Sequence, residues 1–386
     1  MVQLNYMNIL ILNWRSPYDY RSGGAEKITL KYVNYWADKG HKIFWLSSTP
    51  IIKDLYQMVE LNDAVKLINI GITFPNGLVQ VVYFPILLLK MIFHSMKVIK
   101  NNDIDVVIDE IHGLPFFTPF YSKKRNILLV CEVAGSIWDK MYPTPINLIG
   151  KWLEKLVYQI YVKTEVWAIS STTKEDINVL NPNIKVKILP LGIDTKLDSI
   201  QEFRNEEKFE FPSAVFLARI VKMKGIEIAL DAVEIISKTF PNFKLYVIGH
   251  GEEDYILKLK NLVIEKDIEK NVEFLGFITE NEKFNYLSKV HFLFHPSYKE
   301  GFGLTVLEAA LVGTPSIVKK GSNLDTLIIE GKTGFSVDTV NGFANIFIQF
   351  YNDKIAFDLL SKQSLHYIKQ YDWDIVLKKS IEITNI

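Results

Sequence analysis

Two glutamates and two glycines within one short segment are the residues best suited to bind a polar ligand. Glu300, Gly301 and Gly303 lie in a predicted loop after a buried strand, and a helix that starts near Leu304 carries Glu308. Glycines let the backbone approach a ligand closely, and a helix N-terminus offers free N–H groups. Glu300 is suited to accept hydrogen bonds from sugar hydroxyls, and Glu308 from a ribose diol. The alternative is a capped helix with two solvated glutamates.

A second segment carries two cations after another predicted strand. Arg219 follows the apolar run AVFLA, and Lys224 precedes Gly225 at the start of the next helix. Arginine offers a planar fork and lysine a point charge, and together they suit a diphosphate. Two solvated surface cations are the alternative, and Lys222 competes with Lys224 for the role.

A third segment opens the first predicted helix with Gly23 and Gly24, and Glu26 follows in its first turn. The G-x-G-x-x-G pattern of dinucleotide binding is missing here, which argues against a dehydrogenase. The two glycines still permit a phosphate at the helix end. Glu26 either serves a ligand or complements the helix dipole.

The elements that must position these residues are predicted from hydrophobic periodicity. Continuous apolar runs typical of buried strands alternate with amphipathic helical segments along the whole chain. Two successive series of this kind predict an α/β fold with two Rossmann-like domains, joined near residues 190–200. The predicted strands are 8–13, 42–46, 105–108, 126–130, 166–169, 214–217, 244–248, 272–274, 291–294 and 316–318.

Composition narrows the class of protein. The 386 residues include 44 Lys and Arg against 44 Asp and Glu, so no overall charge attracts nucleic acid. Residues 1–195 hold 21 basic and 17 acidic side chains, which makes this half mildly basic. The single Cys131 excludes a disulfide framework. No secretory signal is visible, and Leu78–Ile99 is too interrupted for a membrane span, so a cytoplasmic protein is expected.

The segments RSGGAE, LARIVKMKG, VIGHGEE, VEFLGF, KEGFGLTVLE and EGKTGF, in this order, resemble those of the retaining, nucleotide-sugar-dependent glycosyltransferases of family GT4. The resemblance covers about residues 8–338. It implies the GT-B fold, in which two Rossmann-like domains face each other across a cleft and a final helix crosses back onto the first domain. Residues 1–192 with about 366–386 would form the acceptor-side domain, and residues 193–365 the donor-binding domain.

The resemblance also implies roles for individual residues. Arg219 and Lys224 would hold the donor diphosphate, Glu300 would contact the donor sugar, and Glu308 would bind the ribose. The remaining donor-side positions are Gly276 and Phe277 near the base, and Gly301, Phe302, Gly303 and Leu304 as backbone N–H donors. Gly23 and Gly24 would face the donor phosphates or the acceptor.

The chain departs from the family pattern where many relatives carry histidines at the ends of two first-domain strands. The equivalents here are Glu110, with His112 nearby, and Glu132, which follows Cys131. We expect Glu110 and Glu132 to be polar groups directed into the cleft. The catalytic candidates are Glu300, Glu110, His112 and Glu132. His112 is either structural or a proton carrier, and Cys131 is a small core residue. An acidic family position is filled by Asp325.

Two D-x-D triplets, 103–105 and 372–374, match the metal-binding signature of another glycosyltransferase fold. The first precedes a strand and the second opens a helix, so a turn residue and a helix cap are the favoured interpretations. We expect no metal and no cofactor besides the donor. Fixed cations would then stabilise the departing diphosphate.

Residues 83–100 form an apolar segment with Lys90, Lys97 and Lys100. It is interpreted either as an amphipathic helix that docks on a membrane carrying a lipid-linked acceptor or as a core helix. The aromatic run 116–120 adds apolar surface on the acceptor side.

The leading functional hypothesis is a retaining glycosyltransferase. It would move a sugar from a UDP- or GDP-linked donor to a hydroxyl acceptor, either a lipid-linked one or a growing glycan, by front-face substitution. A nucleotide-sugar epimerase and a non-catalytic nucleotide-sugar-binding module are the rivals. No nucleic-acid partner is expected.

Overall fold

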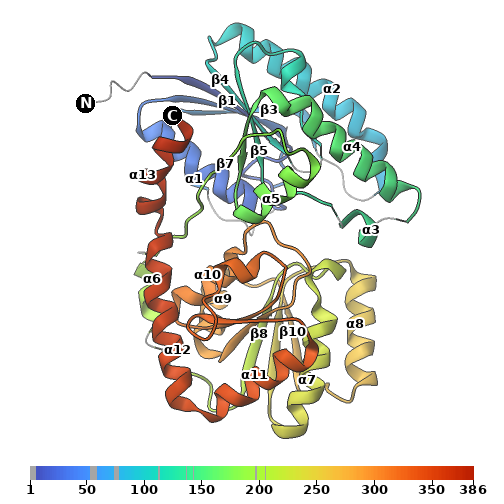
Figure 1. Ribbon diagram of the computed structural model, residues 1–386, viewed down its shortest axis with the longest axis vertical. Helices are drawn as coiled ribbons and strands as arrows, with labels where there is room; N and C mark the ends of the chain where they lie inside the picture. The colour runs from blue at the N-terminus through green and yellow to red at the C-terminus, as the bar shows by residue number, and fades with distance from the viewer. Residues whose placement is uncertain are drawn as a thin grey trace. The chain divides into compact units, whose positions relative to one another are not determined.

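The computed structural model describes residues 6–52, 59–73, 78–111, 114–135, 137–141, 143–195, 198–204 and 206–386. The chain divides into two compact units (Figure 1). Unit 1 comprises Met1–Leu191 and Leu377–Ile386, and unit 2 comprises Gly192–Val376.

Unit 1 is a parallel sheet of seven strands in the order β3-β2-β1-β4-β5-β6-β7, with helices on both faces. The central strands are continuous apolar runs buried on both faces, as the rule for parallel sheets requires. Strand order reverses between β1 and β4. The elements of unit 1 are β1 (Asn8–Leu12), α1 (Gly24–Asp38), β2 (Lys42–Thr49), β3 (Val65–Thr73), α2 (Leu78–Asn101), β4 (Val106–Ile111), η1 (Thr118–Phe120), β5 (Arg125–Val130), α3 (Ile137–Met141), α4 (Ile146–Ile160), η2 (Tyr161–Lys163), β6 (Glu165–Ala168), α5 (Ser171–Leu180) and β7 (Val186–Ile188).

Unit 2 repeats the plan with six parallel strands in the order β10-β9-β8-β11-β12-β13, reversing between β8 and β11. Apolar side chains of α7 and α11 cover one face of this sheet, and those of α9 and α10 cover the other. Its elements are α6 (Asp198–Phe203), β8 (Ser213–Leu217), η3 (Lys222–Lys224), α7 (Ile226–Thr239), β9 (Lys244–Ile248), α8 (Glu253–Glu265), β10 (Val272–Gly276), α9 (Glu280–Lys289), β11 (Phe292–His295), α10 (Leu304–Leu311), β12 (Ser316–Lys319), η4 (Leu324–Leu327), β13 (Gly334–Val337), α11 (Val340–Asn352), α12 (Lys354–Tyr367) and η5 (Ile368–Tyr371).

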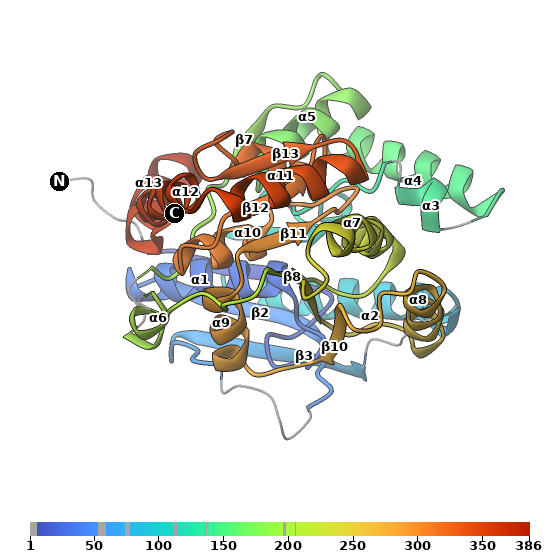
Figure 2. The ribbon, with the colours of Figure 1, turned by 90° about the horizontal axis from the view of Figure 1, so that it is seen from below.

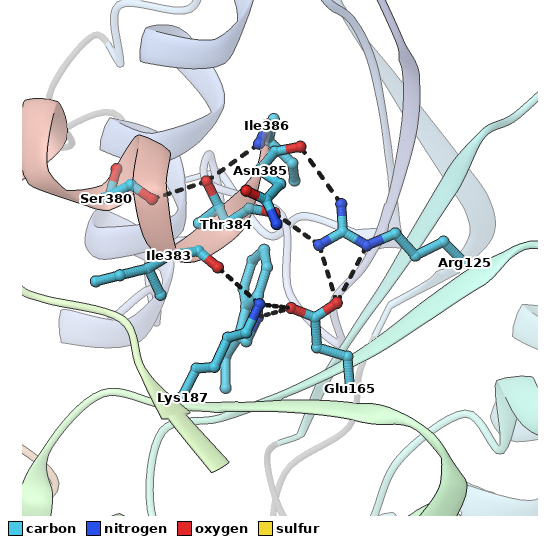
Figure 3. Close-up of polar contacts among 9 residues, drawn as sticks. Arg125, Glu165, Lys187, Ser380, Ile383, Thr384, Asn385 and Ile386 are labelled. Atoms are coloured by element: carbon cyan, nitrogen blue, oxygen red, sulfur yellow. Dashed lines mark hydrogen bonds and ion pairs between the residues drawn. The ribbon is translucent and has the colours of Figure 1, made fainter. Parts of the chain in front are cut away.

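The last helix, α13 (Trp373–Thr384), carries the chain from unit 2 back into unit 1. Its final carbonyl groups are held by two cations of the unit 1 sheet (Figure 3). Arg125 Nη2 donates to the Thr384 carbonyl at 2.6 Å, and Lys187 Nζ donates to the Ile383 carbonyl at 3.0 Å. Glu165 bridges both cations, at 2.9 Å from Arg125 and 2.7 Å from Lys187. Cations at a helix C-terminus satisfy its free carbonyls and its dipole.

The structure returns to unit 1 later than the sequence predicted. The return was expected at about residue 366, but unit 1 resumes only at Leu377. The reason is packing, because Leu360 of α12 and Ile368 of η5 belong to the apolar core of unit 2. The first junction falls after Leu191, beside the predicted residue 192. Three strands, β3, β7 and β13, were missed by periodicity.

No helix of the described residues is long and apolar enough to cross a membrane.

Candidate donor-binding site in unit 2

An ion pair lies where the strand order of unit 2 reverses. Lys224 ends η3, after β8, and Glu300 lies in the loop after β11, the strand beside β8. Lys224 Nζ and Glu300 Oε1 are 2.5 Å apart, and both side chains are largely buried. Ligands of open α/β sheets bind beyond the carboxyl ends of strands at such a reversal. The structure therefore joins two residues that the sequence had placed in separate segments.

Backbone contacts between the two loops hold this pair in place. The Tyr298 N–H donates to the Met223 carbonyl at 2.9 Å, and Ser297 Oγ donates to the same carbonyl at 3.3 Å. Gly225 has a φ of +67°, and a Cβ there would lie 2.3 Å from the Pro296 carbonyl oxygen. Glycine is therefore required at this position by both conformation and space.

Electrostatics keep Glu300 ionised. Burial is the largest influence on the Glu300 carboxyl and alone would raise its pKa, but Lys224, His295 and a hydrogen bond from Ser297 together outweigh burial and hold that pKa below its usual value. His295 Nε2 lies 3.5 Å from Glu300 Oε1. Burial lowers the pKa of His295 to about 4, so its ring is neutral at pH 7. Glu300 is thus a carboxylate at neutral pH, which can accept hydrogen bonds but has no proton to donate.

The glycine-rich loop before α10 is fastened to the loop after β12. Asn323 Nδ2 donates to the Glu300 carbonyl at 3.0 Å and to the Gly301 carbonyl at 2.6 Å. Gly303 has a φ of +101° and forms the N-cap of α10, so Leu304 begins the helix. The side chain of Phe302 packs against the core of unit 2. This arrangement leaves the first backbone N–H groups of α10 beside Glu300.

Arg219 differs from Lys224 in its surroundings. It follows β8 and is exposed, and among the described residues its guanidinium has no ion-pair or hydrogen-bond partner. The loop it belongs to is fixed by backbone contacts: the Ile220 N–H donates to the His250 carbonyl at 2.7 Å, and a Cβ on Gly249 would lie 1.9 Å from the Ala218 carbonyl oxygen. Lys222, the rival of Lys224, is exposed on η3. An exposed guanidinium on a rigid loop is available for an anionic ligand.

Glu308 also lies in an ion pair, with a partner that the sequence gave no reason to select. Lys283 Nζ of α9 is 2.9 Å from Glu308 Oε1 and 2.7 Å from Glu280 Oε1. Burial would lower the pKa of Lys283, but the two carboxylates outweigh it and raise that pKa. Gly276 ends β10 with a φ of +69°, and the ring of Phe277 is 61% exposed beside His250.

The predicted residues of unit 1 lie in a different electrostatic setting. Glu110 is the penultimate residue of β4 and is fully buried; its Oε2 accepts from Thr29 Oγ1 at 2.7 Å and its Oε1 lies 3.8 Å from Cys131 Sγ. Burial and the nearby carboxylates, Glu110 first, raise the pKa of the Cys131 thiol well above its usual value. Glu132 is exposed. His112 lies outside the described residues.

The N-terminus of α1 already binds a carboxylate of its own helix. The Gly23 N–H donates to Glu26 Oε2 at 2.7 Å, and the Glu26 side chain is buried. Gly24 is the first residue of α1 and is exposed. Of the two interpretations of Glu26, this geometry favours the one in which it complements the helix end.

Neither D-x-D triplet forms a metal site among the described residues, which contain no group of three or more His, Cys, Asp and Glu side chains suited to a metal ion. Asp105 Oδ2 accepts from the Asn8 N–H at 2.8 Å. Asp372 Oδ1 accepts from the Asp374 N–H at 3.0 Å at the start of α13. Asp325 Oδ2 accepts from the Gly321 N–H at 3.0 Å. These carboxylates stabilise turns and helix ends.

Sequence reasoning missed His295, Lys283 and Asn323 as parts of this site. His295 is the last residue of β11, so its position at the carboxyl end of a strand was the available signal. Lys283 and Asn323 come from other elements, and only the fold brings them to Glu308 and Glu300.

Comparisons with known proteins agree with this geometry. Residues 199–369 match the family model described as glycosyl transferases group 1. An uncharacterized glycosyltransferase of Methanocaldococcus jannaschii is 25% identical over 218 residues, which are 55% of this chain and 58% of the relative. The chain thus spans about three fifths of the length of that relative.

Solved structures resemble the chain over nearly its full length. Sucrose-phosphate synthase from Thermosynechococcus elongatus aligns with a TM-score of 0.80 and 16% identity over 98% of both chains. Anabaena Alr3699/HepE, in complex with UDP and glucose, aligns with a TM-score of 0.73 and 16% identity over 98% of this chain and 100% of that one. The expected fold class, two Rossmann-like α/β domains as in GT-B glycosyltransferases, is confirmed. The matched residues 199–369 form most of unit 2, and this match agrees with the resemblance to glycosyltransferases in the sequence motifs.

Proposed function

We propose that this chain is a retaining glycosyltransferase that moves a sugar from a nucleoside diphosphate sugar to a hydroxyl acceptor. One observation carries the proposal. Lys224 and Glu300 meet at 2.5 Å where the strand order of unit 2 reverses, and an exposed cation, Arg219, lies on the loop after the same strand as Lys224. A cation for the diphosphate and a carboxylate for the sugar are the two groups that a nucleotide-sugar site requires.

Each side chain has a chemical task in this proposal. Lys224 and Arg219 bind the diphosphate and offset the negative charge that grows on it as the bond to the sugar breaks. Glu300 is ionised because Lys224 keeps the pKa of its carboxyl low, so it accepts hydrogen bonds from the sugar hydroxyls. Free N–H groups at the start of α10 add further donors.

The proton balance favours front-face substitution. The anomeric carbon loses its bond to the diphosphate oxygen and gains a bond to the acceptor oxygen on the same face, which retains the configuration. The acceptor proton passes to the departing diphosphate oxygen. A double displacement would need a carboxylate nucleophile paired with an acid. Glu300 is ionised and cannot be the acid of such a pair, and its ion-pair partners among the described residues are Lys224 and His295, not a second carboxyl group.

The donor nucleotide follows from the other residues of unit 2. Glu308, held by Lys283 at 2.9 Å, is available to accept hydrogen bonds from ribose hydroxyls through its second oxygen. The exposed ring of Phe277 offers a stacking surface for the base. The Anabaena protein of similar fold binds UDP and glucose, which supports a UDP-linked donor, and a GDP-linked donor is the alternative. We expect no metal requirement, because Arg219 and Lys224 supply the positive charge.

The acceptor side belongs to unit 1 in this proposal. Glu110 and Glu132, with Gly23, Gly24 and Glu26, remain its candidate residues. The hydroxyl acceptor is proposed to be carried by a lipid or a growing glycan.

The experiment that tests the function is donor turnover followed by NMR. A panel of UDP- and GDP-sugars is first screened for thermal stabilisation of the protein. Donor cleavage, with water or an added alcohol as acceptor, is then followed by ¹H NMR before the product mutarotates. A product with the donor's anomeric configuration supports the proposal, and an inverted product contradicts it.

The same experiment separates the rival functions. An epimerase would release nucleotide or convert the donor sugar with no dependence on acceptor, whereas a transferase responds to added acceptor. A binding module would be stabilised by the nucleotide and would show no turnover with any donor.

A further inference from the structure

Exposed apolar side chains are concentrated on one layer of unit 1. Of the 24 large apolar side chains that are exposed in the described part of the chain, eleven lie on α2, η1 and α4. They are Tyr83, Ile86, Leu89, Phe93 and Met96 of α2, Phe120 of η1, and Ile146, Leu148, Ile149, Trp152 and Leu156 of α4. We name this set the α2–α4 face. Contiguous apolar surface of this kind marks an interaction site in a folded protein.

Helix α2 is apolar on two opposite sides. Leu87, Met91 and Val98 are buried in the core of unit 1. Leu89 and Phe93, on the other side of the helix, are 67% and 66% exposed. A helix that only covers a sheet needs a single apolar stripe. The second stripe of α2 therefore has a purpose outside the core.

Helix α4 repeats this arrangement. Its one acidic residue, Glu154, is turned inward, where it accepts the N–H groups of Ala134 at 2.7 Å and Gly135 at 2.9 Å. Its outward side presents Trp152, which is 63% exposed, with Ile149 and Leu156 one turn to either side. Burying the only carboxylate leaves an outer side of apolar residues and lysines.

The two helices lie on the same side of the sheet. Leu12 pairs with Asp109 and Asp109 with Leu128, so these side chains share one face, which α2 covers at β1–β3 and α4 covers at β5 and β6. Figures 1 and 2 show α2 and α4 together on this side, with α1 on the other.

The η1 turn joins the two helices into one surface. Ser95 Oγ of α2 donates to Tyr121 Oη at 3.1 Å, and the Thr118 N–H donates to Tyr161 Oη, just after α4, at 3.1 Å. Phe120, 72% exposed, lies on the turn between these two anchors. Hydrogen bonds on both sides of Phe120 therefore tie η1 to α2 and to the end of α4.

The charges on this face have one sign. Helix α2 contains no Asp or Glu, and it exposes Lys90, Lys97 and Lys100. Lys155 of α4 is exposed, and Lys123 and Lys124 follow η1. Lysines beside apolar residues can place their stems in an apolar layer and their ammonium groups among phosphates. The exposed carboxylate of Asp139, on α3, is paired with Lys151 at 2.5 Å.

We propose that the α2–α4 face binds the surface of an anionic lipid bilayer. Apolar and aromatic side chains would enter the interface, and the lysines would contact anionic headgroups. A second copy of the chain is a poorer partner, because matching two such faces would bring lysines against lysines. The inference depends on unit 1 alone and not on the proposed transfer reaction.

Vesicle co-sedimentation of the full chain tests the proposal. We expect binding to phosphatidylcholine vesicles that contain phosphatidylglycerol, and binding to pure phosphatidylcholine that is weaker by about tenfold or more. Replacing Leu89 and Phe93 by Ser, or Ile149 and Trp152 by Ser, should weaken binding by about tenfold. Lys90→Gln with Lys97→Gln should remove most of the dependence on salt.

Matched controls keep the test specific. Leu257 and Ile264 of α8 in unit 2 are 59% and 60% exposed, so replacing both by Ser removes similar apolar area and should leave vesicle binding unchanged. Trp152 also provides a spectroscopic signal: its fluorescence should shift to the blue on anionic vesicles, and Trp152→Phe should remove most of that shift while binding persists.

Three results would overturn the proposal. They are a wild-type chain that stays in the supernatant, equal loss of binding in the α8 control, and a concentration-dependent dimer that the Ile149 and Trp152 variant breaks without any vesicle binding. Circular dichroism and thermal melting establish that each variant is folded, which is expected because every altered side chain is exposed. Donor binding is measured separately, so failure here does not affect the site of unit 2.

Discussion

The points of strand reversal in the two units use buried acidic residues in opposite ways. In unit 2, Glu300 is paired with a cation, Lys224, at 2.5 Å. In unit 1, Glu110 accepts from the neutral hydroxyl of Thr29, and its neighbour Asp109 accepts the Phe116 N–H at 3.0 Å. Similar topology has therefore been equipped with different electrostatics.

Under the proposed function, this difference assigns the anionic part of the donor to unit 2. Burial raises the pKa of a carboxyl group that has no cation beside it. It raises the pKa of Asp109 to about 6 despite the hydrogen bonds that this side chain accepts. Such a site suits hydroxyl groups and repels phosphates. The reversal point of unit 2, with Lys224 and the exposed Arg219, suits a diphosphate. Four changes in unit 2 test this difference: removal of a cation, addition of a Cβ between two backbones, protonation of the buried histidines, and removal of the ion-pair partner of Glu308.

The largest effect is expected from the cations. Lys224→Met and Arg219→Ala should each lower kcat/KM for the donor by about a hundredfold or more, because each removes a positive charge that would stabilise the departing diphosphate. Lys222→Ala, which removes an exposed lysine of the same η3 turn, is the matched control and should cost less than about threefold. Steady-state kinetics with the donor identified in the thermal screen measures all three. A large loss of kcat/KM in Lys222→Ala, with none in Lys224→Met, would show that Lys222 and not Lys224 binds the diphosphate.

The next effect concerns space between backbones. Gly225→Ala should lower the free energy of unfolding by about 3 kcal/mol, since a Cβ would strain a left-handed residue and meet the Pro296 carbonyl. Gly23→Ala in unit 1 is the control. Gly23 has extended backbone and its Cβ would meet only Glu26 Oε2 at 3.7 Å, so a change below about 1 kcal/mol is expected. Denaturant unfolding gives both values, and equal losses would contradict the packing argument.

Acid should destabilise unit 2 through two buried histidines. Burial lowers the pKa of both His291 and His295 to about 4, from an ordinary value of 6.5. The unfolded chain gains these protons first, so the stability that the neutral rings contribute is complete above pH 6.5 and is lost as pH falls towards 4. The loss should reach about 2–3 kcal/mol for each ring. In the variant His295→Asn, the melting temperature should therefore depend less on pH in this window. An unchanged dependence on pH would contradict the contribution of His295.

The smallest effect tests the support of Glu308. Lys283→Met should weaken binding of the nucleoside diphosphate by about tenfold, because Glu308 loses the partner that fixes its position. The rate at saturating donor should change little. Lys289→Met, on the same helix, is the control, since its pairing with Glu206 at 3.7 Å is remote from the site. Calorimetric titration measures the affinity of both variants for the nucleoside diphosphate. Equal affinities would show that Lys283 does not contribute to this site.

Local sequence patterns predicted much of this molecule. Continuous apolar runs identified the central strands of both sheets, and the glycines before Leu304 located the start of α10. These features depend on residues that are neighbours in the chain. Strand β3 (VKLINIGIT) was missed because this edge strand is exposed or half-buried at most positions and lacks the continuous apolar run of the central strands.

The partners of the site residues could not be predicted in the same way. Lys283 lies 25 residues from Glu308, and Asn323 lies 23 residues from Glu300. Only the packing of α9 beside α10 and of two loops at one sheet edge brings them together. Their residue types are common on protein surfaces, so no local pattern distinguishes them.

Calorimetric titration of UDP, UMP, GDP and GMP into the wild-type chain and Arg219→Ala tests whether unit 2 binds a diphosphate. We expect one nucleoside diphosphate to bind at least about tenfold more tightly than its monophosphate, because the second phosphate meets Arg219 and Lys224. We also expect Arg219→Ala to remove most of this preference while the melting temperature of the free protein stays unchanged. Equal affinity for mono- and diphosphates, or a preference that survives in Arg219→Ala, would contradict it.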